Sequence, residues 1–221
     1  MELLERIFSY EFSILLVLIV GIALFSRLNK REKIIFFYVV TILVFDIWGM
    51  SLAIQSKNNW FVYNILIGVE VLFLTAYLNQ VLKYDYQRKY LNISSFFFFV
   101  YSSIHVYFFG MSDLHLPLSM LSGSFLSLFF LLYLIYGQTE SKWIDSTDNW
   151  ISLGSIFYLC GTIPFQALFL YLVDKKQDLA VMLFITINMG LSHFRFLLIL
   201  IGFLLILKRK QSKTEIAAVS A

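Results

Sequence analysis

Residues 33–55 read KIIFFYVVTILVFDIWGMSLAIQ, an apolar run in which Asp46 is the only charged residue between Lys33 and Lys57. An α-helix rises about 1.5 Å per residue, so a run of this length can cross a hydrocarbon core about 30 Å thick. The segment therefore predicts a membrane-spanning helix. A charge in its middle is costly in lipid and indicates either a functional site or a buried ion pair.

Two later apolar segments follow the same pattern. Residues 60–83 read WFVYNILIGVEVLFLTAYLNQVLK and hold Glu70 as their only acid, and residues 179–202 hold Arg195 as their only arginine or lysine. Asp46, Glu70 and Arg195 each lie thirteen residues from a flanking lysine. This spacing places the three residues roughly 20 Å from one membrane surface. Two acids and one base are therefore predicted to share one layer inside the bilayer.

The whole chain has the composition of a membrane protein. Of its 221 residues, 60% are hydrophobic and 14% are charged, which is too apolar for a soluble globule. Apolar runs bounded by charge clusters predict an all-α fold: one polytopic bundle over residues 1–221, with seven transmembrane helices and a short basic tail at 208–221. The predicted spans are residues 10–27, 34–55, 60–82, 91–111, 117–137, 150–173 and 179–207.

The distribution of bases predicts the orientation. One set of connections and the tail hold twelve lysines and arginines, and the opposite set holds four. The positive-inside rule therefore predicts an outside N-terminus, a cytoplasmic C-terminus and a multi-pass protein of the cell membrane. Because the bases cluster at span ends, they act as topology signals, and no nucleic-acid partner is expected.

Polar residues form stripes on several predicted helices. Tyr63, Glu70 and Tyr77 are spaced by seven, which places them on one face of their helix. A second stripe lies in the sixth span, where Tyr158 and Gln166 are eight residues apart and Pro164 interrupts the backbone hydrogen bonding.

The last span carries the remaining candidates. Asn188 and Arg195 lie on one stripe, and His193 lies on an adjacent one. Because lipid-facing charge is costly, the stripes should converge into a polar pocket inside the bundle. Arg195 is expected to pair with Glu70 or Asp46, or to bridge both, and any surplus carboxyl is protonated or balanced by a cation or by His193.

Neither a metal nor a cofactor is expected. His105 and His193 have compatible depths for joint ligation of a haem iron or another metal, but two lone histidines on different helices are more often hydrogen-bonded residues of a bundle. The last span has no lysine for a retinal Schiff base. Ser192 and His193 are consecutive and point about 100° apart on a helix, so they do not form a catalytic pair.

Small residues recur at steps of four in the fifth span, at Ser119, Gly123 and Ser127. Such a stripe lets two helices approach closely. It predicts close packing within the bundle or, alternatively, a homodimer interface.

Three segments resemble those of a loosely defined group of uncharacterised bacterial seven-helix multi-pass membrane proteins. They are VYNILIGVEVLF (62–73), NWISLGSIFYLCGTI (149–163) and NMGLSHFRFLLILIG (188–202). The resemblance implies a grouping by fold and implies no biochemical activity.

Three functions fit these patterns. The first is a ligand-binding or sensor-type module, in which a small or amphipathic molecule enters the polar pocket and a separate cytoplasmic or membrane partner carries the output. The second is a small transporter or proton-coupled carrier, since buried Asp, Glu, Arg and His residues form proton relays. The third is a structural or accessory membrane subunit.

Overall fold

The protein is an all-helical bundle in the computed structural model, which describes residues 11–112, 115–137, 143–173, 175 and 177–219. This part of the chain forms seven α-helices and two short 3₁₀ helices, with no strand. The elements are α2 (Phe12–Ala23), η1 (Phe25–Arg27), α3 (Lys30–Ile54), α4 (Trp60–Val81), α5 (Asp85–Phe109), α6 (Leu116–Tyr136), η2 (Trp143–Asp145), α7 (Thr147–Val173) and α8 (Gln177–Val219).

Local signals explain several helix ends. The first turn of α3 is closed by a capping box, in which the Asn29 side chain accepts from the Glu32 amide and the Glu32 carboxylate accepts from the Asn29 amide. Pro117 lies in the first turn of α6, where its missing N–H has no helical partner to lose. Gly110 ends α5 with a φ of 73°, a conformation that glycine adopts without a steric cost.

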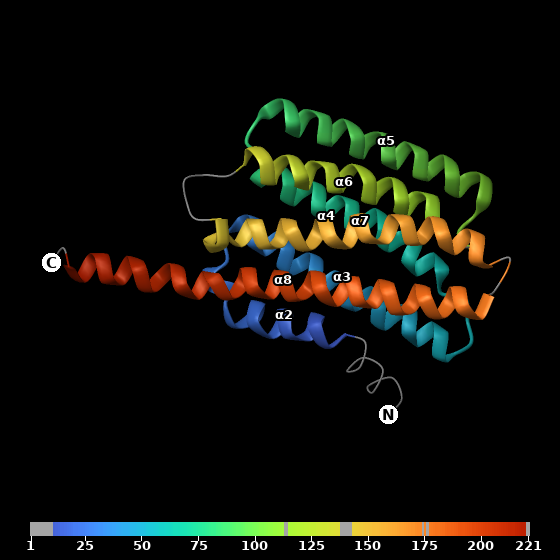
Figure 1. The fold of residues 1–221 in the computed structure, drawn as a ribbon, viewed down its shortest axis with the longest axis horizontal. Helices are drawn as coiled ribbons and strands as arrows, with labels where there is room; N and C mark the ends of the chain where they lie inside the picture. Colours follow the sequence, from blue (N-terminus) through green and yellow to red (C-terminus); the bar gives the residue numbers. More distant parts are fainter. Residues whose placement is uncertain (1–10, 113–114, 138–142, 174, 176, 220–221) are drawn as a thin grey trace.

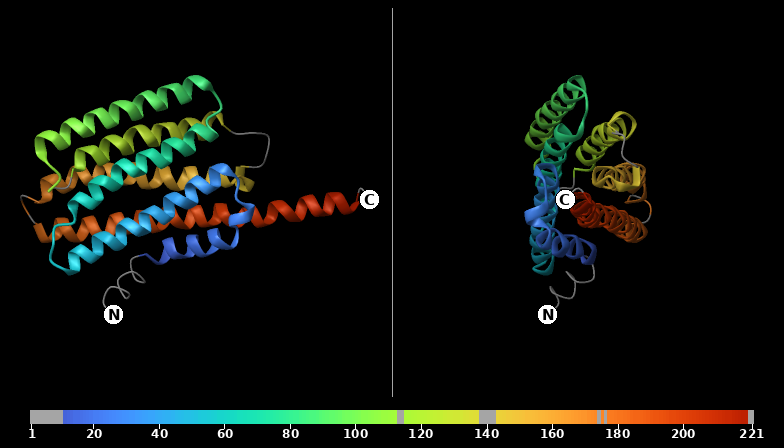
Figure 2. Two further views of the ribbon diagram at one scale, coloured as in Figure 1. Left: turned by 180° about the vertical axis from the view of Figure 1, so that it is seen from behind. Right: turned by 90° about the vertical axis from the view of Figure 1, so that its left-hand side faces the viewer.

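Six of the helices surround a common interior. Neighbouring helices touch in the order α2, α3, α4, α6, α7, α8 and back to α2, which closes a ring. Helix α5 touches α4 and α6 and lies outside this ring. Viewed along the helices, α2 to α5 form one layer and α6 to α8 form the other (Figure 2). The apolar core lies between the two layers.

Six helices are long and apolar enough to cross a membrane. They correspond to the second to seventh predicted spans, so a membrane-spanning helical bundle is confirmed. The first predicted span, residues 10–27, differs. Helix α2 has 12 residues and is therefore about 18 Å long, which is shorter than a typical hydrocarbon core. The predicted span is too long because apolar residues continue to Phe25. Helix α2 already ends at Ala23, and the chain then turns toward α3.

The connections fall at two ends of the bundle (Figure 1). One end, here called the basic end, carries the α2–α3, α4–α5 and α6–α7 connections and the exit of α8. Helix α8 has 43 residues, and its C-terminal part projects beyond the other helices at the basic end (Figure 1). The predicted basic tail therefore continues the helix to Val219, and residues 220–221 lie outside the described part. Three of the bases counted for the orientation, Arg6, Lys142 and Lys176, also lie outside it.

Helices α7 and α8 share the most extensive contact of the bundle, and glycines along this contact let the two backbones approach each other. A Cβ at Gly154 would lie 3.0 Å from the Arg195 carbonyl oxygen and 3.1 Å from the Leu198 Cβ. Near the basic end, the Thr147 hydroxyl donates a 3.0 Å hydrogen bond to the Gly202 carbonyl oxygen. Interhelical bonds of this kind and small residues let transmembrane backbones approach closely.

The small-residue stripe of α6 faces α7 of the same chain. A Cβ at Gly123 would lie 3.4 Å from the Leu159 carbonyl oxygen, and the Ser119 hydroxyl accepts a 2.8 Å hydrogen bond from the Gln166 amide. Ser127 is buried as well. These contacts favour the packing interpretation of the stripe, and the homodimer stays a prediction.

Two glycine substitutions test the close pairing of α7 and α8. Gly154→Leu should lower the unfolding temperature, because the new side chain meets the backbone of α8 and overpacking costs about 1 to 3 kcal/mol. Gly190→Leu is the matched control, since a Cβ there meets no described atom within 4 Å. The measurement is thermal unfolding of both variants in one detergent. Equal unfolding temperatures for the two variants would contradict the close pairing.

Candidate functional site

A buried arginine occupies the interior of the ring. Arg195 of α8 is 2% exposed, and its Nη1 donates a 2.8 Å hydrogen bond to Oε1 of Glu70 on α4, forming a salt bridge. The Tyr38 hydroxyl on α3 donates a 2.6 Å hydrogen bond to the same oxygen. One carboxylate oxygen therefore receives donors from α3 beside it and from α8 across the ring.

Two tyrosine rings cover the guanidinium. The Arg195 Cζ lies 4.9 Å from the ring centre of Tyr38 and 4.7 Å from that of Tyr158 on α7. An aromatic face attracts a cation through its quadrupole, and the attraction is strongest where water is excluded. We call the cluster of Arg195, Glu70, Tyr38 and Tyr158 the arginine cage. It joins α3, α4, α7 and α8 around the charge of one guanidinium.

Part of the guanidinium has no hydrogen-bond partner. Nε and Nη2 of Arg195 are buried and unpaired within the described part of the chain. Leaving a buried donor unpaired costs about 1 to 3 kcal/mol, and more when the group is charged. Nε and one N–H of Nη2 form an edge that suits two oxygens of one anion. This edge is closed to solvent in the structure, so a partner reaches it only if the cage opens.

Carboxyl groups outnumber the arginine near the cage. Asp46 of α3 is partly buried and lies close enough to Glu70 and Glu11 to interact with both carboxyls electrostatically. Among the described residues Asp46 has neither a hydrogen bond nor a salt bridge. The Glu70 side chain is 17% exposed, so the cage is less covered on its carboxylate side. Arg195 therefore pairs with Glu70, and Asp46 and Glu11 are the surplus acids.

The tyrosines predicted to flank Glu70 contact other groups. Tyr63 packs against Gly49 of α3, where a Cβ would lie 2.7 Å from the Tyr63 hydroxyl oxygen. The Tyr77 hydroxyl donates a 3.0 Å hydrogen bond to the Asp148 carboxylate at the basic end. A spacing of seven residues separates side chains by about 10 Å along the helix axis. Tyr63, Glu70 and Tyr77 therefore lie on one face of α4, but they do not belong to one site.

The other predicted residues of the site also have separate surroundings. His193 Nδ1 shares a 2.7 Å hydrogen bond with the Ser13 hydroxyl of α2, and Gln166 donates to Ser119 of α6. Asn188 is partly buried, and no hydrogen bond joins its side chain to another described residue. Of the eight predicted residues, the structure joins Glu70 and Arg195 directly and places Asp46 close by.

A second polar network lies at the basic end. Arg31 forms a 2.9 Å salt bridge with Asp148, whose side chain is 5% exposed. The Tyr133 hydroxyl donates a 3.1 Å hydrogen bond to the neighbouring Asn149 side chain. The network holds the starts of α3 and α7 against the ends of α4 and α6. The sequence does not predict this network, because bases at span ends indicate the topology and not their partners.

The two histidines considered for joint metal ligation have different neighbours. The His105 ring of α5 lies 4.5 Å, centre to centre, from that of His115, whereas His193 bonds to Ser13. In the described part of the chain, no group of three or more His, Cys, Asp or Glu side chains is arranged to hold a metal ion. Joint ligation by His105 and His193 therefore has no geometric support.

Comparisons of the chain with protein-family models, with curated proteins and with solved structures found no match. The geometry of the arginine cage and its surroundings is therefore the basis on which a function can be proposed.

Removing one hydroxyl tests the geometry of the arginine cage. Tyr38→Phe keeps the ring over the guanidinium and loses the hydrogen bond to Glu70, so the free energy of unfolding should fall by about 1 to 3 kcal/mol. Tyr158→Phe is the matched control, because no hydrogen bond joins the Tyr158 hydroxyl to a described residue and its ring remains in place. Chemical or thermal unfolding in one detergent provides the measurement. A loss for Tyr158→Phe as large as that for Tyr38→Phe would show that the Glu70 contact is not the cause.

Proposed function

We propose that the protein is a ligand-binding, sensor-type membrane module, in which a small amphipathic molecule with an anionic group binds at Arg195. The observation that carries this proposal is the buried and unpaired edge of the guanidinium formed by Nε and Nη2. An anion that reaches this edge gains charge-assisted hydrogen bonds and removes the cost of two unpaired donors. Its apolar part remains among the apolar side chains of the ring.

The arrangement of the cage supports coupling between binding and helix packing. Helices α7 and α8 are joined closely through Gly154 and Gly202, whereas α3 and α4 reach Arg195 through the long side chains of Tyr38 and Glu70. An anion at the Nε and Nη2 edge shares the charge of Arg195 with Glu70 and repels its carboxylate, so binding loosens α3 and α4 from the α7–α8 pair. A ligand shifts a conformational equilibrium only through such a difference in affinity between two states.

The output of such a module depends on a separate protein. The connections described at both ends of the bundle are short, and most of the chain lies in helices. We propose that the basic end faces the cytoplasm, as the excess of bases predicts. The partner then meets the connections at this end and the projecting part of α8.

The surplus of acids favours a second candidate, a proton-coupled carrier. Asp46 has no hydrogen bond or salt bridge among the described residues, and it interacts electrostatically with Glu11 and Glu70. Carboxyls grouped at one depth inside a membrane can exchange protons as a substrate anion enters or leaves. This candidate needs the same anion site at Arg195 and adds a proton carried by Asp46.

Binding of decanesulfonate, a permanently charged amphipath, tests the anion site. We expect saturable binding to the purified protein in nanodiscs of zwitterionic lipid, measured by calorimetry against empty nanodiscs. Arg195→Gln should weaken binding at least about tenfold, since a charged hydrogen bond contributes about 1.5 to 3 kcal/mol. Glu70→Gln should strengthen it, because the repulsion between the Glu70 carboxylate and the bound sulfonate is gone. Lys57→Gln, an exposed base far from the cage, is the control and should not change binding.

Uncharged decanol and uptake measurements separate the alternatives. The anion site would be contradicted if decanol bound as tightly as decanesulfonate, or if Arg195→Gln bound decanesulfonate as tightly as the wild type. Either result would favour a structural role. Uptake of labelled decanesulfonate into proteoliposomes under an imposed pH gradient, lost in Asp46→Asn while binding remains, would favour the carrier. Binding without uptake would favour the sensor-type module.

A further inference from the structure

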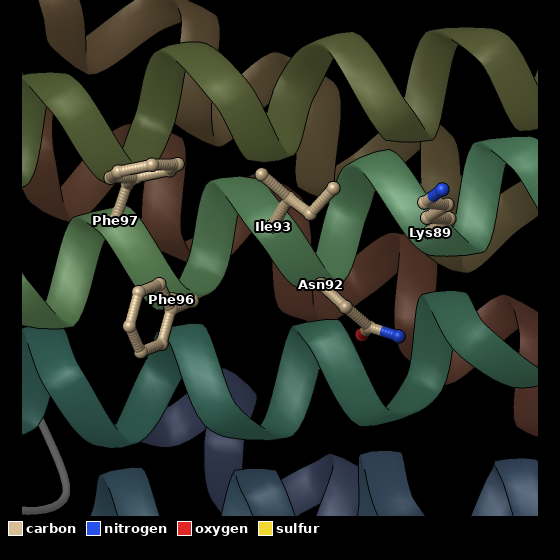
Figure 3. A pocket seen from close by; sticks show the side chains of 5 residues that line it. All are labelled: Lys89, Asn92, Ile93, Phe96 and Phe97. Carbon is tan, nitrogen blue, oxygen red and sulfur yellow. The ribbon is translucent and has the colours of Figure 1, made fainter.

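The outer face of α5 carries a shallow hollow close to the basic end (Figure 3). Five side chains of α5 line it, namely Lys89, Asn92, Ile93, Phe96 and Phe97. All five are exposed, because α5 lies outside the ring of six helices. The described part of the chain leaves this face to the membrane.

The hollow changes from polar to apolar along the helix. Lys89 lies one turn inside the start of α5 at Asp85, and Phe97 lies about 12 Å deeper. Tyr86 and Tyr90 are exposed beside Lys89, and exposed tyrosines of transmembrane helices are enriched at the level of the lipid headgroups. Lys89 therefore lies at headgroup depth, and Phe97 lies at the depth of the acyl chains.

The polar end of the hollow offers free donors. Lys89 has no hydrogen bond, ion pair or aromatic contact with any described residue. Asn92 accepts a 2.8 Å hydrogen bond from Asn79 through Oδ1, so its own amide N–H groups are available. One ammonium and one amide thus lie one turn apart, which suits the oxygens of a phosphate group.

Neighbouring bases are already engaged. Arg88 donates to the Leu82 carbonyl oxygen and forms a 3.1 Å salt bridge with Asp85. Lys83 lies over the Tyr84 ring, 5.5 Å from its centre. The charge of Lys89 therefore remains uncompensated on this face, and the Asp85 carboxylate is neutralised by Arg88.

We infer that the hollow is a binding site for an anionic glycerophospholipid. Its phosphate lies against Lys89 and the Asn92 amide, and one acyl chain packs along Ile93, Phe96 and Phe97. The charge selects an anionic headgroup, while the apolar wall holds the chain in place. This site is separate from the arginine cage and does not depend on the proposed function.

Native mass spectrometry of the full chain tests the site. The protein is released from micelles that contain equal amounts of palmitoyl-oleoyl phosphatidylglycerol and palmitoyl-oleoyl phosphatidylcholine, and the retained lipids are counted. The wild type should retain phosphatidylglycerol in preference. Lys89→Gln should lower this preference about fivefold, which is the effect of one lysine near a membrane surface. Ile93→Trp fills the hollow and should lower retention of both lipids.

Lys57→Gln is the matched control, because Lys57 is exposed at the opposite end of the bundle. Equal preference in Lys89→Gln and the wild type would overturn the site, as would an equal loss in Lys57→Gln. Unchanged retention of both lipids in Ile93→Trp would also overturn it. The substituted side chains are exposed, and matching unfolding temperatures confirm that each variant folds.

Discussion

A guanidinium inside a membrane bundle must be neutralised and partnered, and this requirement organises the structure around Arg195. Glu70 supplies the opposite charge, and the rings of Tyr38 and Tyr158 replace part of the hydration shell. These partners come from α4, α3 and α7, so the layer of α2 to α5 meets the layer of α6 to α8 at this charge. An ion pair buried in this way is weak evidence for stability by itself, because desolvation offsets the attraction.

The incomplete pairing of Arg195 is the observation from which both proposed functions start. A purely structural ion pair is most favourable when all its donors are paired, yet Nε and Nη2 have no described partner. Asp46 lies nearby without a hydrogen bond or salt bridge among the described residues. The interior therefore retains both an unpaired guanidinium edge and surplus carboxyls, and the two proposed functions differ in which of these groups they use.

The sequence allowed much of this arrangement to be predicted. The apolar runs predicted six spanning helices correctly, and counting residues from the flanking lysines placed Glu70 and Arg195 at one depth, where they form a salt bridge. Tyr38 could not be identified, because counting from Lys33 places it about 12 Å nearer the membrane surface than Glu70, and such counting does not show how α3 lies against α4. The partner of Asp148 depends on how helix ends meet, which periodicity does not encode. The first span was predicted too long for the same reason: hydropathy does not show where a chain turns.

A double-mutant cycle between Glu70 and Arg195 tests most directly whether the two layers are coupled through this charge. The free energy of unfolding is measured in one detergent for the wild type, Glu70→Gln, Arg195→Gln and the double variant. The arginine cage predicts a coupling energy of about 1 to 3 kcal/mol, since contacting residues deviate from additivity by such amounts. Losses that add within about 0.5 kcal/mol would contradict it, because additivity is the behaviour of independent sites.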